Sequence, residues 1–141
     1  MTNNNGERSQ PVKVLVVDDE TLVRTMMCDA LQAIGYAPLT ASSGEKALQT
    51  VKAERPACVL LDIMMPDLDG YDTCAALKAD AGTASMPVIL VSATTDGRVI
   101  RHAEKAGAAT VLRKPVRMDE LQRAIVLALD SRARARTVEA G

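Results

Sequence analysis

Hydrophobic and polar positions along the chain follow two different spacings. Short apolar runs, typical of strands buried on both faces of a sheet, occur at 14–17, 59–61, 88–91 and 111–112, with a weaker run at 37–40. Longer segments between them carry apolar residues at helical spacing, around 22–34, 47–51, 71–77, 99–106 and 121–129. Because strands alternate with helices, the pattern predicts right-handed βαβ crossovers and a parallel five-stranded sheet. The expected fold class is therefore α/β, a single doubly wound (βα)5 sandwich.

Local signals predict where some of these helices begin and end. Gly35 and Gly107 follow the first and fourth helical segments, where glycine commonly terminates a helix. Ser42 and Glu45 have the spacing of a capping box, which predicts Ser42 as the N-cap of the second helix.

The domain limits follow from the same pattern. Residues 1–11 are polar, and we expect a disordered N-terminal lead there. The domain is expected to span 12–130. Residues 131–141 are expected to form a helix end and an arginine-containing tail.

Composition narrows the possible functions. The chain has 141 residues and a net charge of -1, which suits one domain and argues against nucleic acid as a partner. Its apolar runs fall well short of the ~20 residues of a transmembrane helix, so we expect no membrane partner. Cys28, Cys58 and Cys74 are odd in number and lack Cys-x-x-Cys spacing, which favours core residues in a reducing compartment over zinc ligands or disulfides. The expected location is the cytoplasm.

Polar side chains follow four of the five predicted strands. Asp18 and Asp19 follow the first strand, Asp62 the third, Ser92 the fourth and Lys114 the fifth. Each has a plain alternative interpretation, as a helix cap, a loop carboxylate or a solvated lysine. Because the carboxyl ends of parallel strands form one edge of the sheet, where ligands bind in open α/β folds, the set as a whole favours a functional site.

The chemistry of these residue types points to phosphoryl transfer. Two carboxylates at ~4 Å repel by roughly 4 kcal/mol at an effective dielectric near 20, so the cluster should bind a proton or recruit a cation. Oxygen ligands without histidine or cysteine favour Mg²⁺, with Mn²⁺ possible. Lys114 adds a positive charge suited to a phosphoryl oxygen, and a carboxylate can itself be the nucleophile.

Four segments then resemble the receiver domain of two-component response regulators. They are Val14–Glu20, Leu60–Gly70, Val91–Ala93 and Lys114–Pro115, and the resemblance covers about 12–130. It implies a flavodoxin-like fold with the strand order 2-1-3-4-5 that is known for the chemotaxis regulators of this family.

The resemblance also implies a role for each residue at this edge. Asp62 would be the phosphoacceptor and, with Asp19, a direct Mg²⁺ ligand. The backbone carbonyl of Met64 would be a third ligand, and Asp18 would act mainly through a bound water. Ser92 and Lys114 would contact the phosphoryl group, and Pro115 would be a cis proline.

The function implied is a phosphorylation-controlled switch. A histidine kinase or phosphotransfer protein would phosphorylate Asp62, without turnover of a separate substrate. The surface of the fourth helix, fifth strand and fifth helix would then contact a downstream protein or a second copy of the chain. Two alternatives remain: a phosphorylation-independent interaction or dimerisation module, and, less favoured, a Mg²⁺-dependent phosphohydrolase.

The sequence departs from the family at its usual output positions. Val111 and Val116 stand where relatives commonly carry an aromatic ring. Because Val111 has no ring, the rotamer change of an aromatic side chain cannot relay the signal at this position. We therefore expect phosphorylation to perturb residues 93–104 more than residues 109–113.

Overall fold

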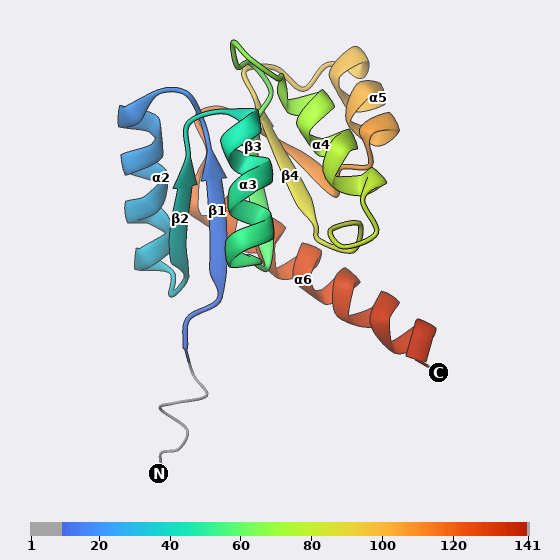
Figure 1. Ribbon diagram of the computed structural model, residues 1–141. Coiled ribbons are helices and arrows are strands. Elements are labelled where there is room, and N and C mark those ends of the chain that lie inside the picture. Colours follow the sequence, from blue (N-terminus) through green and yellow to red (C-terminus); the bar gives the residue numbers. More distant parts are fainter. Residues whose placement is uncertain (1–9, 141) are drawn as a thin grey trace.

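The computed structural model describes residues 10–140, with side chains through residue 132, and it contains one five-stranded parallel sheet (Figure 1). The strand order is β2-β1-β3-β4-β5, as the resemblance implied. Residues 1–9 of the predicted lead lie outside the described residues. The strands are β1 (Lys13–Val17), β2 (Ala37–Ala41), β3 (Cys58–Asp62), β4 (Val88–Ser92) and β5 (Thr110–Arg113).

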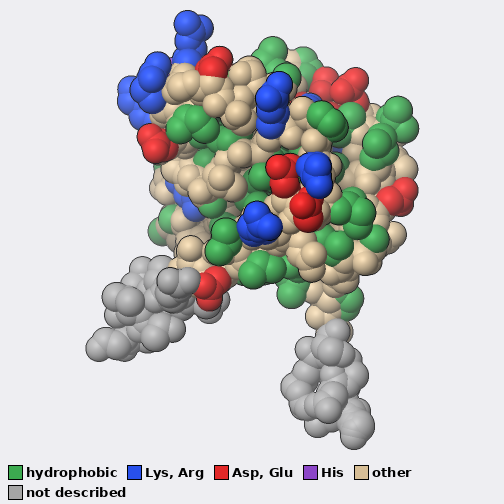
Figure 2. Space-filling model, turned by 180° about the vertical axis from the view of Figure 1, so that it is seen from behind, with side chains coloured by type: hydrophobic (Ala, Val, Ile, Leu, Met, Phe, Trp, Pro, Cys, Tyr) green, Lys and Arg blue, Asp and Glu red, His purple; other side chains and the backbone are tan. Residues whose placement is uncertain are grey.

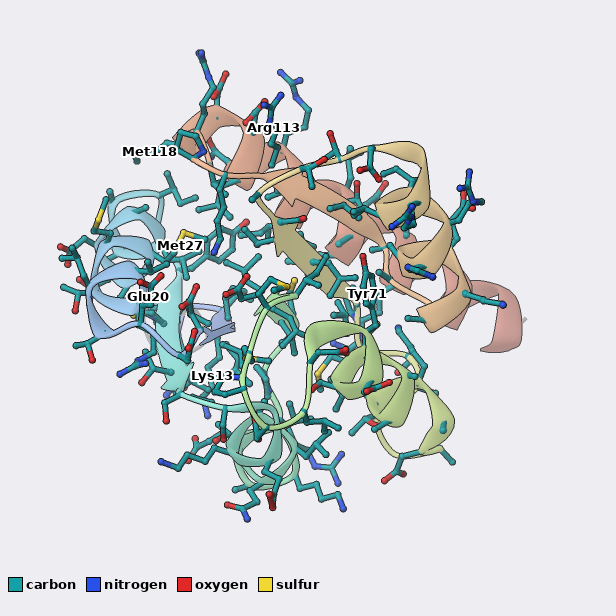
Figure 3. All side chains as sticks on the ribbon, turned by 90° about the horizontal axis from the view of Figure 1, so that it is seen from above. Lys13, Glu20, Met27, Tyr71, Arg113 and Met118 are labelled. Carbon is teal, nitrogen blue, oxygen red and sulfur yellow. The ribbon has the colours of Figure 1, made fainter. Side chains whose placement is uncertain are left out.

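Five helices cover the two faces of the sheet. Side chains of α2 (Thr21–Ala33) and α6 (Met118–Ala140) pack on one face. On the other face lie α3 (Gly44–Glu54), α4 (Gly70–Ala79) and α5 (Gly97–Ala106). Figure 3, which looks onto the edge where the strands end, shows Met27 of α2 and Tyr71 of α4 on opposite sides of the sheet. The predicted doubly wound α/β sandwich is confirmed.

The core consists of two aliphatic clusters separated by the sheet. Alternate residues of β1 point to opposite faces: Leu15 packs under α3, α4 and α5, whereas Val14 packs under α2 and α6. Cys58 and Cys74 are fully buried in these clusters, as predicted. Burial raises the pKa of Cys58 to about 12 and that of Cys74 to about 11, so both thiols stay protonated at neutral pH.

The helix boundaries agree with the predictions except at the start of α3. The N-cap of α3 is Ser43, whose side chain accepts a hydrogen bond from the Lys46 N–H at 3.1 Å. The predicted cap, Ser42, instead lies 3.2 Å from the Lys46 amine, so the capping-box prediction is wrong by one residue. Gly35 and Gly107 have φ values of 97° and 89°, and both follow the end of a helix, as expected.

The C-terminal segment continues the last helix. At 131–141 we expected a helix end and an arginine-containing tail, and α6 continues to Ala140 and extends beyond the sheet in Figure 1. The segment 131–140 is rich in alanine and arginine, which favour helix, and it contains no glycine or proline. Within the described part of the chain, no helix is both long and apolar enough to cross a membrane.

Candidate functional site

Three carboxylates meet where β1 and β3 end. Asp62 is the last residue of β3, and Asp18 and Asp19 directly follow β1, which is hydrogen-bonded to β3. One oxygen from each of the three lies within 4.8 Å of the others. Asp18 is 3% exposed and Asp62 is 5% exposed, whereas Asp19 is open to solvent. The N-cap of α2 is Glu20, so neither aspartate has the capping role that was the plain alternative.

Lys114 brings a positive charge to this cluster from the end of β5. Its Nζ lies 3.2 Å from Oδ1 of Asp62 and 3.7 Å from Oδ2 of Asp18, with its side chain about one-third exposed. The peptide bond between Lys114 and Pro115 is cis, as the resemblance implied. Lys114 is therefore paired with the buried carboxylates rather than simply solvated.

Ser92 occupies the end of β4 at the same edge of the sheet. The register pairs Asp62 with Val91, so Ser92 lies one residue further along. The Ser92 side chain is nearly buried, and its Oγ accepts a hydrogen bond from the Thr94 N–H at 3.2 Å. The N-cap of α5 is Asp96, so Ser92 is not the plain helix cap of the alternative interpretation.

Negative charge exceeds positive charge at this edge of the sheet. Burial raises the pKa of the Asp62 carboxyl, and the neighbouring Asp18 raises it further, against the opposing effects of Lys114 and the Met64 backbone N–H. Burial alone would lower the pKa of Lys114, but the carboxylates of Asp62 and Asp18 outweigh it and the pKa is raised. One ammonium thus faces three carboxylates, counting Asp19, which leaves a net negative cluster.

The residues at this edge fit a hard divalent cation. The cluster offers carboxylate oxygens alone, the ligands that Mg²⁺ and Mn²⁺ prefer, and its charge excess is what such an ion would neutralise. The backbone of Met64 also borders the cluster, because its N–H lowers the pKa of the Asp62 carboxyl. The predicted role of the Met64 carbonyl as a ligand stays a prediction.

A family model described as the response regulator receiver domain matches residues 14–126. The chain belongs to this family. It is thus a receiver domain of two-component signal transduction, in a family that is generally regulatory rather than catalytic. Receiver domains generally bind Mg²⁺ in an acidic pocket, and response regulators interact with histidine kinases.

Curated relatives match the receiver along most of this chain but only part of their own length. A protein of Porphyridium aerugineum named "Probable transcriptional regulator ycf27" is 37% identical over 80% of this chain and 46% of its own. "DNA-binding response regulator MtrA" of Mycolicibacterium paratuberculosis is 34% identical over 77% of this chain and 47% of its own. The chain thus spans less than half the length of these two relatives. Their names conflict with our expectation that nucleic acid is no partner, although the part that this chain matches is a receiver domain.

Solved structures show the same architecture over nearly their whole length. A putative response regulator from Chloroflexus aurantiacus is 30% identical with a TM-score of 0.82, covering 86% of this chain and 99% of its own. Chemotaxis protein CheY4 of Vibrio cholerae is 26% identical with a TM-score of 0.80, covering 84% of this chain and 99% of its own.

One residue that contacts this edge was missed in the sequence. The guanidinium of Arg24, on α2, donates a hydrogen bond to the backbone carbonyl of Asp18 at 2.7 Å. It also donates to the Thr21 hydroxyl at 3.1 Å. Its position one turn into the helix after the aspartate pair was the available signal.

A groove of about 550 Å³ leads to the cluster between α2 and the start of α6. Asp18, Asp62 and Lys114 lie in its lining, with apolar walls that include Met27 and Met118. Figure 3 shows both methionines on one side of the sheet, and Figure 2 shows hydrophobic patches between charged side chains on the α2 and α6 side. Asp62 thus lines a groove with largely apolar walls.

A second hollow lies along the outer side of β5, between this edge strand and α6. Its lining includes Val111, which is half-buried against the α3, α4 and α5 core. Val116 packs instead against the α2 and α6 core. The two positions that lack the family's aromatic residues therefore lie on opposite faces of the sheet.

Proposed function

We propose that this receiver accepts a phosphoryl group on Asp62 from a histidine kinase or phosphotransfer protein. The observation that supports this most directly is the pairing of the buried Asp62 carboxylate with Lys114 at 3.2 Å, inside a cluster with excess negative charge. A buried carboxylate with raised pKa is costly to the fold, and a reactive role is one reason for such an arrangement.

The transfer follows from the placement of these groups. A carboxylate oxygen of Asp62 attacks the phosphorus of the donor phosphohistidine. The new O–P bond forms as the P–N bond breaks, and the imidazole nitrogen leaves with the electron pair. Lys114 neutralises charge on the phosphoryl oxygens, and the Ser92 hydroxyl donates a hydrogen bond to one of them.

Mg²⁺ would be held by Asp19, Asp62 and the Met64 carbonyl, with Asp18 acting through a water molecule. Its contribution when bound is to offset negative charge on the phosphoryl oxygens and the carboxylates. Arg24 fixes the backbone of Asp18, so the carboxylates are already oriented before a phosphodonor arrives.

Intact mass measured after incubation with Mg²⁺ and acetyl phosphate tests this proposal. We expect addition of one phosphate to the parent protein and to Asp29→Asn, a matched control at an exposed aspartate. Asp62→Asn should stay unmodified. Sustained turnover of phosphodonor in excess of slow self-dephosphorylation would favour the phosphohydrolase alternative. Absence of labelling in the parent protein would favour a phosphorylation-independent interaction module.

We further propose that phosphorylation promotes binding of a second copy of the chain at the α5, β5 and α6 face. β5 is an edge strand, and the hollow beside it carries both Glu120 and Arg123 around the exposed Leu127. A face with charges of both signs around an apolar centre can complement itself in a twofold dimer.

Light scattering of the protein with Mg²⁺ and beryllofluoride tests this second proposal. A dimer is expected for the parent protein and a monomer for Leu127→Glu. The control is Leu22→Glu on α2, because the two leucines are comparably exposed, Leu22 to 70% and Leu127 to 56%. This control variant should still form the dimer. A parent protein that stays monomeric would indicate a different protein as the target.

A further inference from the structure

We propose that Asp67 is a positioning residue, which holds the loop 63–69 so that the Met64 backbone stays in place beside Asp62. This inference rests on the proposed function, because it concerns the same metal-binding edge. The loop joins β3 to α4, and the Gly70 N–H donates to the Ile63 carbonyl at 2.8 Å, which holds the two ends of the loop together.

The tip of this loop, Asp67, is hydrogen-bonded to α3, which is not one of the two elements that the loop joins. The two carboxylate oxygens of Asp67 accept hydrogen bonds from the first two backbone N–H groups of α3, those of Gly44 at 3.4 Å and Glu45 at 3.2 Å. The next backbone N–H, that of Lys46, donates a hydrogen bond to the side chain of the N-cap residue Ser43. The start of α3 thus has two acceptors, one local and one from a loop more than 20 residues away in sequence.

A carboxylate is well suited to this attachment. The helix dipole places partial positive charge at the start of α3, which favours an ionised group there. Hydrogen bonding from the Leu68 N–H lowers the pKa of Asp67, and the Glu45 and Gly44 N–H groups lower it further. Asp67 therefore stays ionised wherever the domain is folded near neutral pH.

The contact between the loop and α3 is also closely packed. A Cβ at Gly44 would lie 2.7 Å from the Leu68 carbonyl oxygen and would also collide with the Thr73 hydroxyl. That hydroxyl donates to the Asp69 carbonyl at 2.9 Å. The last residues of the loop thus lie in close contact with the start of α3.

Met64 lies between these two anchors, two residues after Asp62 and three before Asp67. Its backbone N–H is near enough to the Asp62 carboxyl to lower the pKa of that group, whereas its side chain is exposed. Because each peptide unit is planar, release of the tip would allow the peptides around Met64 to rotate as units. Asp67 thus acts on Asp62 and on a bound metal through the backbone of Met64.

The experiment compares Asp67→Ala, Asp67→Asn and the matched control Ser43→Ala, which removes the other acceptor at the same helix end. Mg²⁺ affinity is measured by titration of amide NMR shifts, and the Met64 amide is also recorded without metal. Asp67→Ala should weaken Mg²⁺ binding by about tenfold, the lower end of the loss for groups that orient metal ligands. Asp67→Asn, which keeps one acceptor oxygen, should weaken it less.

The control separates positioning from general stability. Ser43→Ala should lower the unfolding temperature comparably but leave both the Mg²⁺ affinity and the Met64 amide shift unchanged. Equal Mg²⁺ affinity in Asp67→Ala and Ser43→Ala would overturn the inference while leaving the proposed function in place. If Asp67→Ala does not fold, Asp67→Asn carries the test, and parent-like affinity in that variant overturns the inference. No Mg²⁺ binding by the parent protein would overturn the proposed function itself.

Discussion

The acidic edge, formed by Asp18, Asp19, Asp62 and Lys114, and the outer side of β5 hold their side chains in opposite ways. At the acidic edge, Asp18 and Asp62 are almost fully buried, and both lie within 4 Å of the Lys114 amine. Along β5 the four residues are exposed or half-buried, and Val111 lines an open hollow. The first region holds its charged groups in place, and the second presents a surface to solvent.

The difference indicates which region can vary in sequence at little cost. Phosphoryl transfer depends on positioning and charge, so its groups must be held to within about 0.5 Å. An output surface needs only to change shape or mobility enough to alter binding of a partner. The chain has no phenylalanine or tryptophan and carries valine at 111 and 116, whereas the acidic edge has Asp18, Asp19, Asp62 and Lys114.

The largest expected effect concerns the metal. Mg²⁺ at 100 times its dissociation constant should stabilise the parent protein by about 2.7 kcal/mol, because it binds only the folded state. Asp62→Asn should lose most of this gain, and Asp29→Asn should keep it. Urea unfolding with and without Mg²⁺ measures the difference. An equal gain in Asp62→Asn would mean that the acidic edge is not where the metal binds.

Close packing behind Asp62 gives the second effect. A Cβ at Gly70 would lie 2.5 Å from the Asp62 carbonyl oxygen and 2.6 Å from the Ile63 Cα. Gly70→Ala should therefore lower the free energy of unfolding by about 1–3 kcal/mol, the usual cost of overpacking. Gly82→Ala, where the nearest atom is 3.4 Å away on an exposed side chain, should change it by less than about 0.5 kcal/mol. Similar unfolding curves for the two variants would show that the acidic edge tolerates movement.

A smaller effect is the pH dependence of the metal-free protein. Burial and Asp18 raise the pKa of Asp62 above its ordinary value of 3.8, so its contribution to stability is present below that pH. It is lost as the pH rises through the raised pKa. Relative to Asp62→Asn, the parent should therefore lose stability as pH increases across this window. Urea unfolding in a chelator at several pH values measures this effect. A free energy of unfolding that rises with pH in the parent relative to Asp62→Asn would contradict the prediction.

The smallest effect is expected on the β5 side. Val111→Ala removes methyl groups that are only half-buried, so it should cost about 1 kcal/mol or less. It should leave the beryllofluoride-induced shifts of residues 93–104 as they are in the parent. Loss of those shifts in Val111→Ala would show that the signal does pass through β5.

Sequence patterns predicted the parts of the molecule that depend on local order. The strands are recognisable as apolar runs, and Asp18, Asp62 and Lys114 are notable because each follows one. Which strands lie side by side depends on contacts between distant segments, and the order came from the resemblance rather than from periodicity. The separation of the carboxylates could therefore be stated only after the order was known.

The contacts that the sequence did not predict join segments from different elements. Ser42 and Ser43 are adjacent, and the local pattern favoured the wrong serine. Gly44 fits closely against Leu68, a contact that no window around the helix start contains. Asp67 was missed for the same reason, since the helix end that it binds lies 22 and 23 residues before it.

The central claim is that the phosphoryl site is complete and that its signal passes through α5 and the loop that precedes it. Backbone amide NMR shifts with and without beryllofluoride test this claim most directly. We predict large changes at Asp62, Met64 and Lys114, and larger changes over 93–104 than over 109–113. Larger changes around Val111 would contradict the claim about the output path, and no change at Asp62 would contradict the claim about the site.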